Sequence, residues 1–182
     1  DMKNTWREKL MDKVFAELQL MWDGTDKERL KDLVTLLLNS KDKLIVGLGA
    51  GRMGYSLQSF VMRLSHLGFN SFMIGDTTLP RVDSDSIALV NTSSGETPSI
   101  KLYVEQCKNA GVYVVALTTN PQSSIAMLAD IIVTVPAIDS NQLMKTVYEQ
   151  YSFLLFDYIA GEVLKLSELD ISWVEQNHSI LE

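Results

Sequence analysis

Five short and nearly continuous apolar runs, separated by stretches long enough to hold a helix, constrain the fold more than any other feature. They cover residues 44–48, 71–74, 87–90, 112–117 and 131–135. A strand that is buried on both faces of a parallel sheet has this continuous apolar character. Strands joined by crossovers of this length form right-handed βαβ units. The sequence therefore predicts an α/β fold with a doubly wound, five-stranded parallel sheet flanked by helices.

Helical periodicity accounts for much of the remaining chain. Apolar residues recur at three- and four-residue spacing, the helical period, and the expected helices cover residues 6–21, 30–38, 54–67, 98–110, 122–129 and 141–164, with a last one from residue 170. A chain of 182 residues without a repeat or linker fits one domain. We expect that domain to cover residues 1–182, with N-terminal helices in 1–40, the sheet core in 41–137 and C-terminal helices in 138–182.

Composition excludes several classes of function. The net charge of −7 argues against nucleic-acid binding, which needs positive charge to neutralise phosphates. No apolar stretch approaches the roughly 20 residues of a membrane span, and we expect no membrane partner. The start of the chain lacks a signal-peptide core, and Cys107 is the only cysteine, so we expect a cytoplasmic protein. A small phosphorylated ligand remains possible, because backbone N–H groups at a helix N-terminus can hold one phosphate.

The first candidate loop, residues 49–54, follows the first expected strand and opens a helix. Gly49 and Gly51 permit positive φ and close approach of the backbone to an anion, and Arg52 adds a cation. The loop also has the GxGxxG spacing of a dinucleotide site, with Asp76 after the second strand where a ribose-binding acid is expected. A tight strand–helix turn needs the same glycines. This loop alone therefore leaves an anion site, a dinucleotide site and a simple turn open.

The second candidate loop follows the third expected strand and is rich in hydroxyl groups. It contains, in order, Thr92, Ser93, Ser94, Gly95, Glu96 and Thr97. Pro98 stands at the expected first helical position, where no N–H is needed. A helix N-cap by Ser94 or Thr97 would need one hydroxyl, whereas this loop has four.

The two loops should meet at one edge of the sheet. In a five-stranded sheet of order 2-1-3-4-5, ligands bind where the strand order switches, between strands one and three. A dinucleotide site does not require the hydroxyl-rich loop, whereas a compact phosphate pocket does. The pair of loops therefore favours a sugar phosphate over NAD.

The hydroxyl-rich loop resembles the Ser-x-Ser-Gly-Glu-Thr signature of SIS (sugar isomerase) domains, which hold sugar phosphates. Residues 49–52 and 62–69 are similar to the Gly-x-Gly-Arg-Ser-Gly and Met-Arg-Leu-x-His-Leu-Gly-Phe segments of 6-phospho-3-hexuloisomerases. Residues 75–80 and 177–182 resemble their Gly-Glu-Thr-x-x-Pro segment and their closing His-Ala-Asn-Leu-Glu. The resemblance extends over nearly the whole chain.

This resemblance implies the SIS fold and a reversible isomerisation between 3-hexulose 6-phosphate and fructose 6-phosphate. The family's reaction passes through a cis-enediol and uses neither a metal nor a cofactor. Its members are homotetramers whose active sites are completed across subunits. Glu149 matches the enolisation base, and His66 matches the histidine of the second proton transfer or ring opening, contributed by a neighbouring subunit. The phosphate-binding positions match Thr92, Ser94 and Thr97, and the other candidate binding residues are Gly49, Gly51, Arg52, Asp76, Ser93, Gly95, Glu96 and His178.

Structural interpretations of the two catalytic candidates remain open. His66 lies in the last turn of an expected helix, where a cation stabilises the helix dipole. Glu149 follows Lys145 by four residues, the spacing of a surface ion pair. His178 is equally well a tail residue near the end of the chain.

The chain also departs from the family pattern. Met53 stands where the family has Ser, and residues 142–146 lack the family's Pro and Gly. These changes suggest another phosphosugar, such as a pentose 5-phosphate, or a non-catalytic sensing SIS module. No basic helix-turn-helix precedes the sheet, and a NAD-binding protein is the most distant alternative. Surplus apolar surface on the first helix and on residues 151–164 further predicts self-association.

Overall fold

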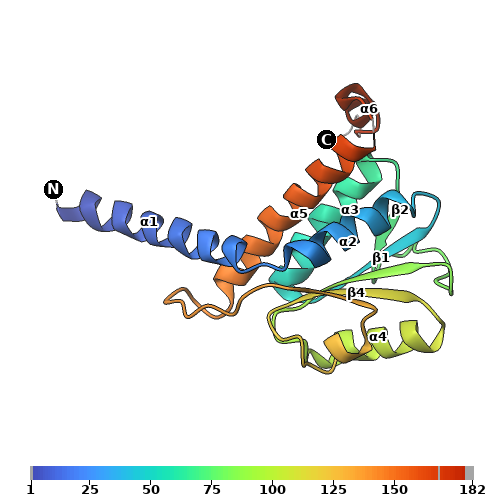
Figure 1. Cartoon of the computed structure of the whole chain (residues 1–182), viewed down its shortest axis with the longest axis horizontal. Coiled ribbons are helices and arrows are strands. Elements are labelled where there is room, and N and C mark those ends of the chain that lie inside the picture. The colour runs from blue at the N-terminus through green and yellow to red at the C-terminus, as the bar shows by residue number, and fades with distance from the viewer. Residues whose placement is uncertain (1, 168, 179–182) are drawn as a thin grey trace.

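A parallel five-stranded sheet forms the centre of the computed structural model, which describes residues 2–167 and 169–178 (Figure 1). The strand order is β2-β1-β3-β4-β5, and every neighbouring pair is parallel. The strands are β1 (Leu44–Gly49), β2 (Asn70–Met73), β3 (Ile87–Asn91), β4 (Tyr113–Thr118) and β5 (Ile131–Thr134). The predicted doubly wound fold and its strand order are confirmed.

Helices cover both faces of this sheet. They are α1 (Met2–Asp23), α2 (Lys27–Leu38), α3 (Gly51–His66), α4 (Pro98–Asn109), α5 (Thr146–Leu166) and α6 (Ile171–Gln176), with a 3₁₀ turn η1 (Ala126–Leu128). Figure 1 shows α2, α3 and α5 on one face and α4 on the other. Within the described ranges, none of these helices has the length and apolar character that crossing a membrane requires.

Two apolar cores lie on the two faces, because successive strand residues point to opposite sides. Ile45 packs with α2, α3 and α5, whereas its neighbour Val46 packs on the α4 side. In the same way, Leu89 faces the larger core and Val90 faces the smaller one. The continuous apolar character of these strands thus reflects burial on both faces.

The first helix projects from the body of the molecule towards the N-terminus (Figure 1). Its C-terminal end is anchored by Met21, which is buried in the larger core, and by Leu18 and Trp22, which pack against that core. Further out, Leu10 and Phe15 are exposed. This helix therefore offers an apolar surface that its own chain leaves uncovered.

Two sequence-based helix assignments are wrong in extent. Residues 122–129 form only the turn η1, because Gly95 O and the Glu96 carboxylate accept the N–H groups of Ile125 and Ser124. The long C-terminal helix begins at Thr146 and not at residue 141. Its start is delayed because Met144 has a φ of 52°, a left-handed conformation that interrupts the helical hydrogen bonds.

A buried hydrogen-bond network joins α3, β3, β4 and α5. The Tyr148 hydroxyl lies 2.7 Å from Asn91 Oδ1 and 2.9 Å from the Leu117 carbonyl oxygen. The Asn91 amide donates to Ser56 Oγ at 2.9 Å, and the Ser56 and Ser152 hydroxyls are 2.9 Å apart. Burial raises the pKa of Tyr148 well above its ordinary value, so the phenol remains a donor. The network sets the position of α5 against α3.

We expect Tyr148→Phe to lower the free energy of unfolding by about 1–3 kcal/mol, because it leaves buried acceptors with fewer partners. Urea denaturation measures the loss. Tyr55→Phe is the matched control, since Tyr55 is 72% exposed and its substitution should change stability by less than about 0.5 kcal/mol. Equal effects of the two substitutions would show that the buried phenol contributes nothing to stability.

Candidate functional site

The two loops singled out from the sequence begin side by side at the carboxyl ends of β1 and β3. These strands are neighbours, and their last residues, Gly49 and Asn91, are paired in the register. The loops also touch, because the Ser93 N–H points to Met53 Sδ at an N···S distance of 3.3 Å. The site therefore lies at the switch in strand order, where open α/β sheets bind ligands.

The glycines of the first loop allow close packing of strand against helix. A Cβ on Gly54 would lie 2.8 Å from Gly49 O, and a Cβ on Gly49 would lie 2.9 Å from Gly54 Cα. Gly51 has a φ of 57°, and a Cβ there would meet no atom within 4 Å, so only its backbone conformation favours glycine. The simple-turn interpretation thus accounts for Gly49 and Gly54, and the turn places the N-terminus of α3 beside the second loop.

The second loop is held rigidly by its own side chains and by the segment after β4. Gly95 has a φ of 69°, and a Cβ there would lie 1.9 Å from Ser123 Oγ. The Ser93 carbonyl oxygen accepts from the hydroxyls of Thr118 and Thr119, each at 2.9 Å. Glu96 Oε1 accepts from Ser124 N at 2.7 Å, and this hydrogen bond lowers the pKa of the Glu96 carboxyl. Glu96 therefore fixes the loop.

The four hydroxyl residues of this loop divide into two pairs. Thr92 and Ser93 are buried, and Thr92 Oγ1 accepts from Gly95 N at 3.2 Å. Ser94 is exposed and Thr97 is half-buried. Thr97 occupies the N-cap position of α4, but its side chain makes no capping hydrogen bond. Ser94 and Thr97 are thus placed to contact a ligand at the N-terminus of α4, whereas Thr92 and Ser93 support the loop.

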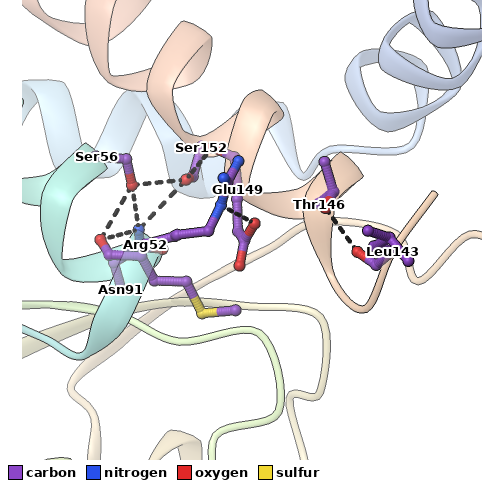
Figure 2. Close-up of polar contacts among 8 residues, drawn as sticks. Arg52, Ser56, Asn91, Leu143, Thr146, Glu149 and Ser152 are labelled. Carbon is purple, nitrogen blue, oxygen red and sulfur yellow. Dashed lines mark hydrogen bonds and ion pairs between the residues drawn. The ribbon is translucent and has the colours of Figure 1, made fainter.

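Arg52 and Glu149, which are 97 residues apart in the sequence, form an ion pair beside these loops (Figure 2). Arg52 Nε lies 2.5 Å from Glu149 Oε2. The Glu149 side chain is 14% exposed and the Arg52 side chain 66% exposed. The alternative partner, Lys145, contacts Glu149 only through the backbone, where Glu149 N donates to Lys145 O. The surface pair with Lys145 is therefore replaced by a pair between two candidate site residues.

The buried network described above also places Glu149. Ser152 Oγ donates to the Glu149 carbonyl oxygen at 3.0 Å, and Figure 2 shows Ser152 pointing to Ser56 while the Glu149 carboxylate points to Arg52. Tyr148 anchors the preceding position in the core. A carboxylate that is mostly buried on a fixed helix can act as a proton acceptor towards a ligand at the loops. The guanidinium has five N–H groups, and those outside the ion pair can reach a ligand as well.

A hollow of about 610 Å³ lies on the other side of this ion pair, between α1, α3 and α5. Arg52, Glu149 and Gln150 line it together with Met11, Val14, Phe15, Leu18, Tyr55, Ser56, Phe153 and Leu154. Gln150 Oε1 is buried and has no hydrogen-bond partner among the described residues. No residue of the hydroxyl-rich loop lines the hollow, and most of its walls are apolar. This shape suits another protein surface better than a sugar phosphate.

His66 and His178 lie together, but at the opposite end of α3. The two ring centroids are 4.9 Å apart, with His66 buried and His178 exposed. Arg52 and His66 are separated by 14 residues of α3, or about 21 Å of helix axis. Figure 1 shows α6, which precedes His178, beyond the C-terminal ends of α3 and α5. One chain therefore does not bring His66 and Glu149 to the same ligand.

Asp76 closes the turn that follows the edge strand β2. Its carboxylate accepts from the Met73 N–H at 2.8 Å, and its own N–H donates to the Met73 carbonyl oxygen. This turn accounts for the acid without a ribose. Within the part of the chain that the structure describes, no group of three His, Cys, Asp or Glu residues is placed to hold a metal ion.

Sequence reasoning missed the polar residues behind the site. Asn91, Ser56 and Ser152 were not assigned a role, and neither was Tyr148. A partial signal was present, because Tyr148 and Ser152 flank Glu149 at positions that fall on the buried face of α5. Hydroxyl groups within an otherwise apolar helical face usually find partners.

Comparison with known families agrees with this geometry. The SIS domain model matches residues 37–159, which include both loops, the ion pair and all five strands. The chain belongs to the SIS domain family.

Individual relatives extend this similarity. A Bacillus subtilis 3-hexulose-6-phosphate isomerase is 32% identical over 143 residues, which cover 74% of this chain and 77% of the relative. A Methanococcus jannaschii protein, whose structure was reported to infer a function of 3-hexulose-6-phosphate isomerase, has a TM-score of 0.85 at 27% identity and covers 96% and 99% of the two chains. An Escherichia coli CFT073 protein, solved in complex with a phosphosugar, has a TM-score of 0.81 at 21% identity, with 97% and 99% coverage, and shows the fold alone.

Gly95→Ala should destabilise the protein more than Gly51→Ala, as measured by urea denaturation. Both positions have positive φ, so each substitution costs about 1–2 kcal/mol in backbone strain. Only Gly95→Ala adds an overlap with Ser123, and Ser123→Gly should therefore recover part of its loss. Equal losses for the two alanine variants, or no recovery in the double variant, would contradict the close packing of this loop.

Proposed function

We propose that this protein is a sugar-phosphate isomerase that interconverts 3-hexulose 6-phosphate and fructose 6-phosphate through a cis-enediol. The observation that carries the proposal is the position of Glu149, a mostly buried carboxylate paired with Arg52 beside the SIS loop. Similarity to named 3-hexulose-6-phosphate isomerases supports the choice of substrate.

In this proposal the ligand phosphate binds at the N-terminus of α4. The Ser94 and Thr97 hydroxyls donate to its oxygens, and the free N–H groups and dipole of the helix stabilise its negative charge. Arg52 contributes a cation from the neighbouring loop. The sugar then extends towards Glu149, because Arg52 connects the loop to that carboxylate.

Glu149 acts as the base in this scheme. It removes the proton from C2 of the 3-hexulose phosphate while O3 takes up a proton, which gives the enediol with a C2–C3 double bond. Loss of the O2 proton and protonation of C3 then give fructose 6-phosphate. The reaction moves protons and one carbonyl group within the molecule without net oxidation, so it requires neither a metal nor a redox cofactor.

Glu149→Gln should lower turnover of fructose 6-phosphate by at least about 100-fold, the typical contribution of a general base, while leaving sugar-phosphate affinity within a few-fold. Formation of 3-hexulose 6-phosphate is followed by NMR, and affinity by calorimetry. Glu162→Gln is the matched control, since Glu162 lies on the same helix, faces Lys165 and is remote from the loops.

The outcomes separate the competing functions. Undiminished turnover in Glu149→Gln would remove Glu149 from the mechanism. Binding of fructose 6-phosphate without turnover by the wild-type protein would favour another phosphosugar substrate or a sensing SIS module. A thermal shift with a dinucleotide, and none with sugar phosphates, would favour a NAD-binding protein.

We further propose that the chain assembles as a homotetramer whose active sites are shared between subunits. His66 lies about 21 Å along α3 from Arg52, so it can serve a substrate at Glu149 only from a second copy. The exposed His178 beside it would present this histidine pair at the surface. The apolar hollow next to Glu149 and the exposed face of α1 offer a surface for that second copy.

Mixed assemblies of two inactive variants test this arrangement. Glu149→Gln and His66→Asn subunits, each inactive alone, should regain activity when they are co-expressed, because some sites then combine an intact Glu149 with an intact His66. Light scattering should give about four times the 20.4 kDa chain mass for each variant and for the mixture. A monomeric mass, or a mixture that stays inactive, would overturn the shared site.

A further inference from the structure

Met53 reaches from the first turn of α3 into the hydroxyl-rich loop. Its Sδ lies 3.3 Å from the Ser93 nitrogen and accepts that N–H. The backbone of Met53 is fixed, because its carbonyl oxygen accepts from Asn91 Nδ2 at 2.9 Å and from Ser56 Oγ at 3.0 Å. The side chain is half-buried and packs against the larger core. The thioether is therefore held against the loop from a rigid base.

Three backbone N–H groups of the loop are bonded to side-chain acceptors. Gly95 N donates to Thr92 Oγ1 at 3.2 Å, and Glu96 N donates to Ser94 Oγ at 3.3 Å. The third, Ser93 N, has the sulfur of Met53 as its side-chain acceptor. A thioether is a weak acceptor compared with a hydroxyl oxygen. Of these three bonds, the one to Met53 is therefore the least costly to exchange.

A phosphate oxygen is a much better acceptor for the same N–H. Hydrogen bonds to an ionised acceptor are shorter and roughly twice as strong as neutral ones. The methionine side chain is also flexible, with three rotatable bonds, and can be displaced while its backbone stays in place. An anion that enters the loop therefore gains by replacing the sulfur at Ser93.

We propose that Met53 sets the affinity of this loop for phosphate groups, because its thioether occupies the Ser93 N–H that a phosphate would otherwise take. The inference rests on the proposed phosphate-binding role of the loop and identifies a residue that opposes that binding. A phosphosugar then binds with the Ser93 donor only after Met53 has moved aside. Removal of the side chain makes the donor accessible from the start.

Calorimetric titration with inorganic phosphate tests this proposal on the full chain. We expect Met53→Ala to bind phosphate about tenfold more tightly than the wild type, the size of one hydrogen bond to a charged group. Met53→Leu retains the volume that packs on the core but has no acceptor, and we expect it to bind about threefold more tightly. Met62→Ala is the matched control, because Met62 is an exposed methionine on the same helix, and its affinity should equal that of the wild type.

The Ser93 amide gives a second readout that needs no substitution. In the wild-type protein, phosphate titration should shift the Ser93 amide proton resonance downfield as a stronger acceptor replaces the sulfur. Unchanged affinity in both Met53 variants, or a Ser93 resonance that does not respond to bound phosphate, would overturn the role of Met53 alone. Absence of phosphate binding in the wild type and in every variant would overturn the phosphate site together with it.

Discussion

The candidate site depends on one buried hydrogen-bond network, which fixes α5 against α3 and the third strand. Tyr148, Asn91, Ser56 and Ser152 are all buried, and each of them bonds to at least one of the others. Buried polar groups are costly without partners, so the elements cannot slide past one another without breaking several bonds together. Because Glu149 lies between Tyr148 and Ser152 on α5, the same bonds hold its carboxylate beside Arg52.

The loop that faces Glu149 is constrained with similar strictness. Gly95 has no room for a Cβ beside Ser123, and Glu96 holds the segment after β4 through Ser124. These contacts pre-organise the loop around the N-terminus of α4, and a pre-organised site avoids the entropic cost of ordering on binding. The Met53 sulfur is the adaptable member of this otherwise rigid arrangement, since the side chain is flexible and its bond to Ser93 is weak.

Sequence reasoning succeeded where local pattern and topology suffice. The continuous apolar runs predicted the five strands, and the two unusual loops marked β1 and β3 as the neighbours at the switch point. It failed for residues 122–129, because there tertiary hydrogen bonds from Gly95 and Glu96 take N–H groups that a helix would use. The start of α5 was misplaced for a related reason, since periodicity does not reveal the left-handed conformation of Met144.

By itself, the sequence determined the fold class, the strand order and the identity of the two loops, because burial period and glycine placement are local properties of the chain. Only the tertiary structure decided which side chains meet. It paired Glu149 with Arg52 and not with Lys145, separated His66 from Glu149 by the length of α3, and placed the Met53 sulfur on the Ser93 N–H. Such contacts join residues tens of positions apart, and their geometry follows from how α3 and α5 pack on the sheet, which no local pattern encodes.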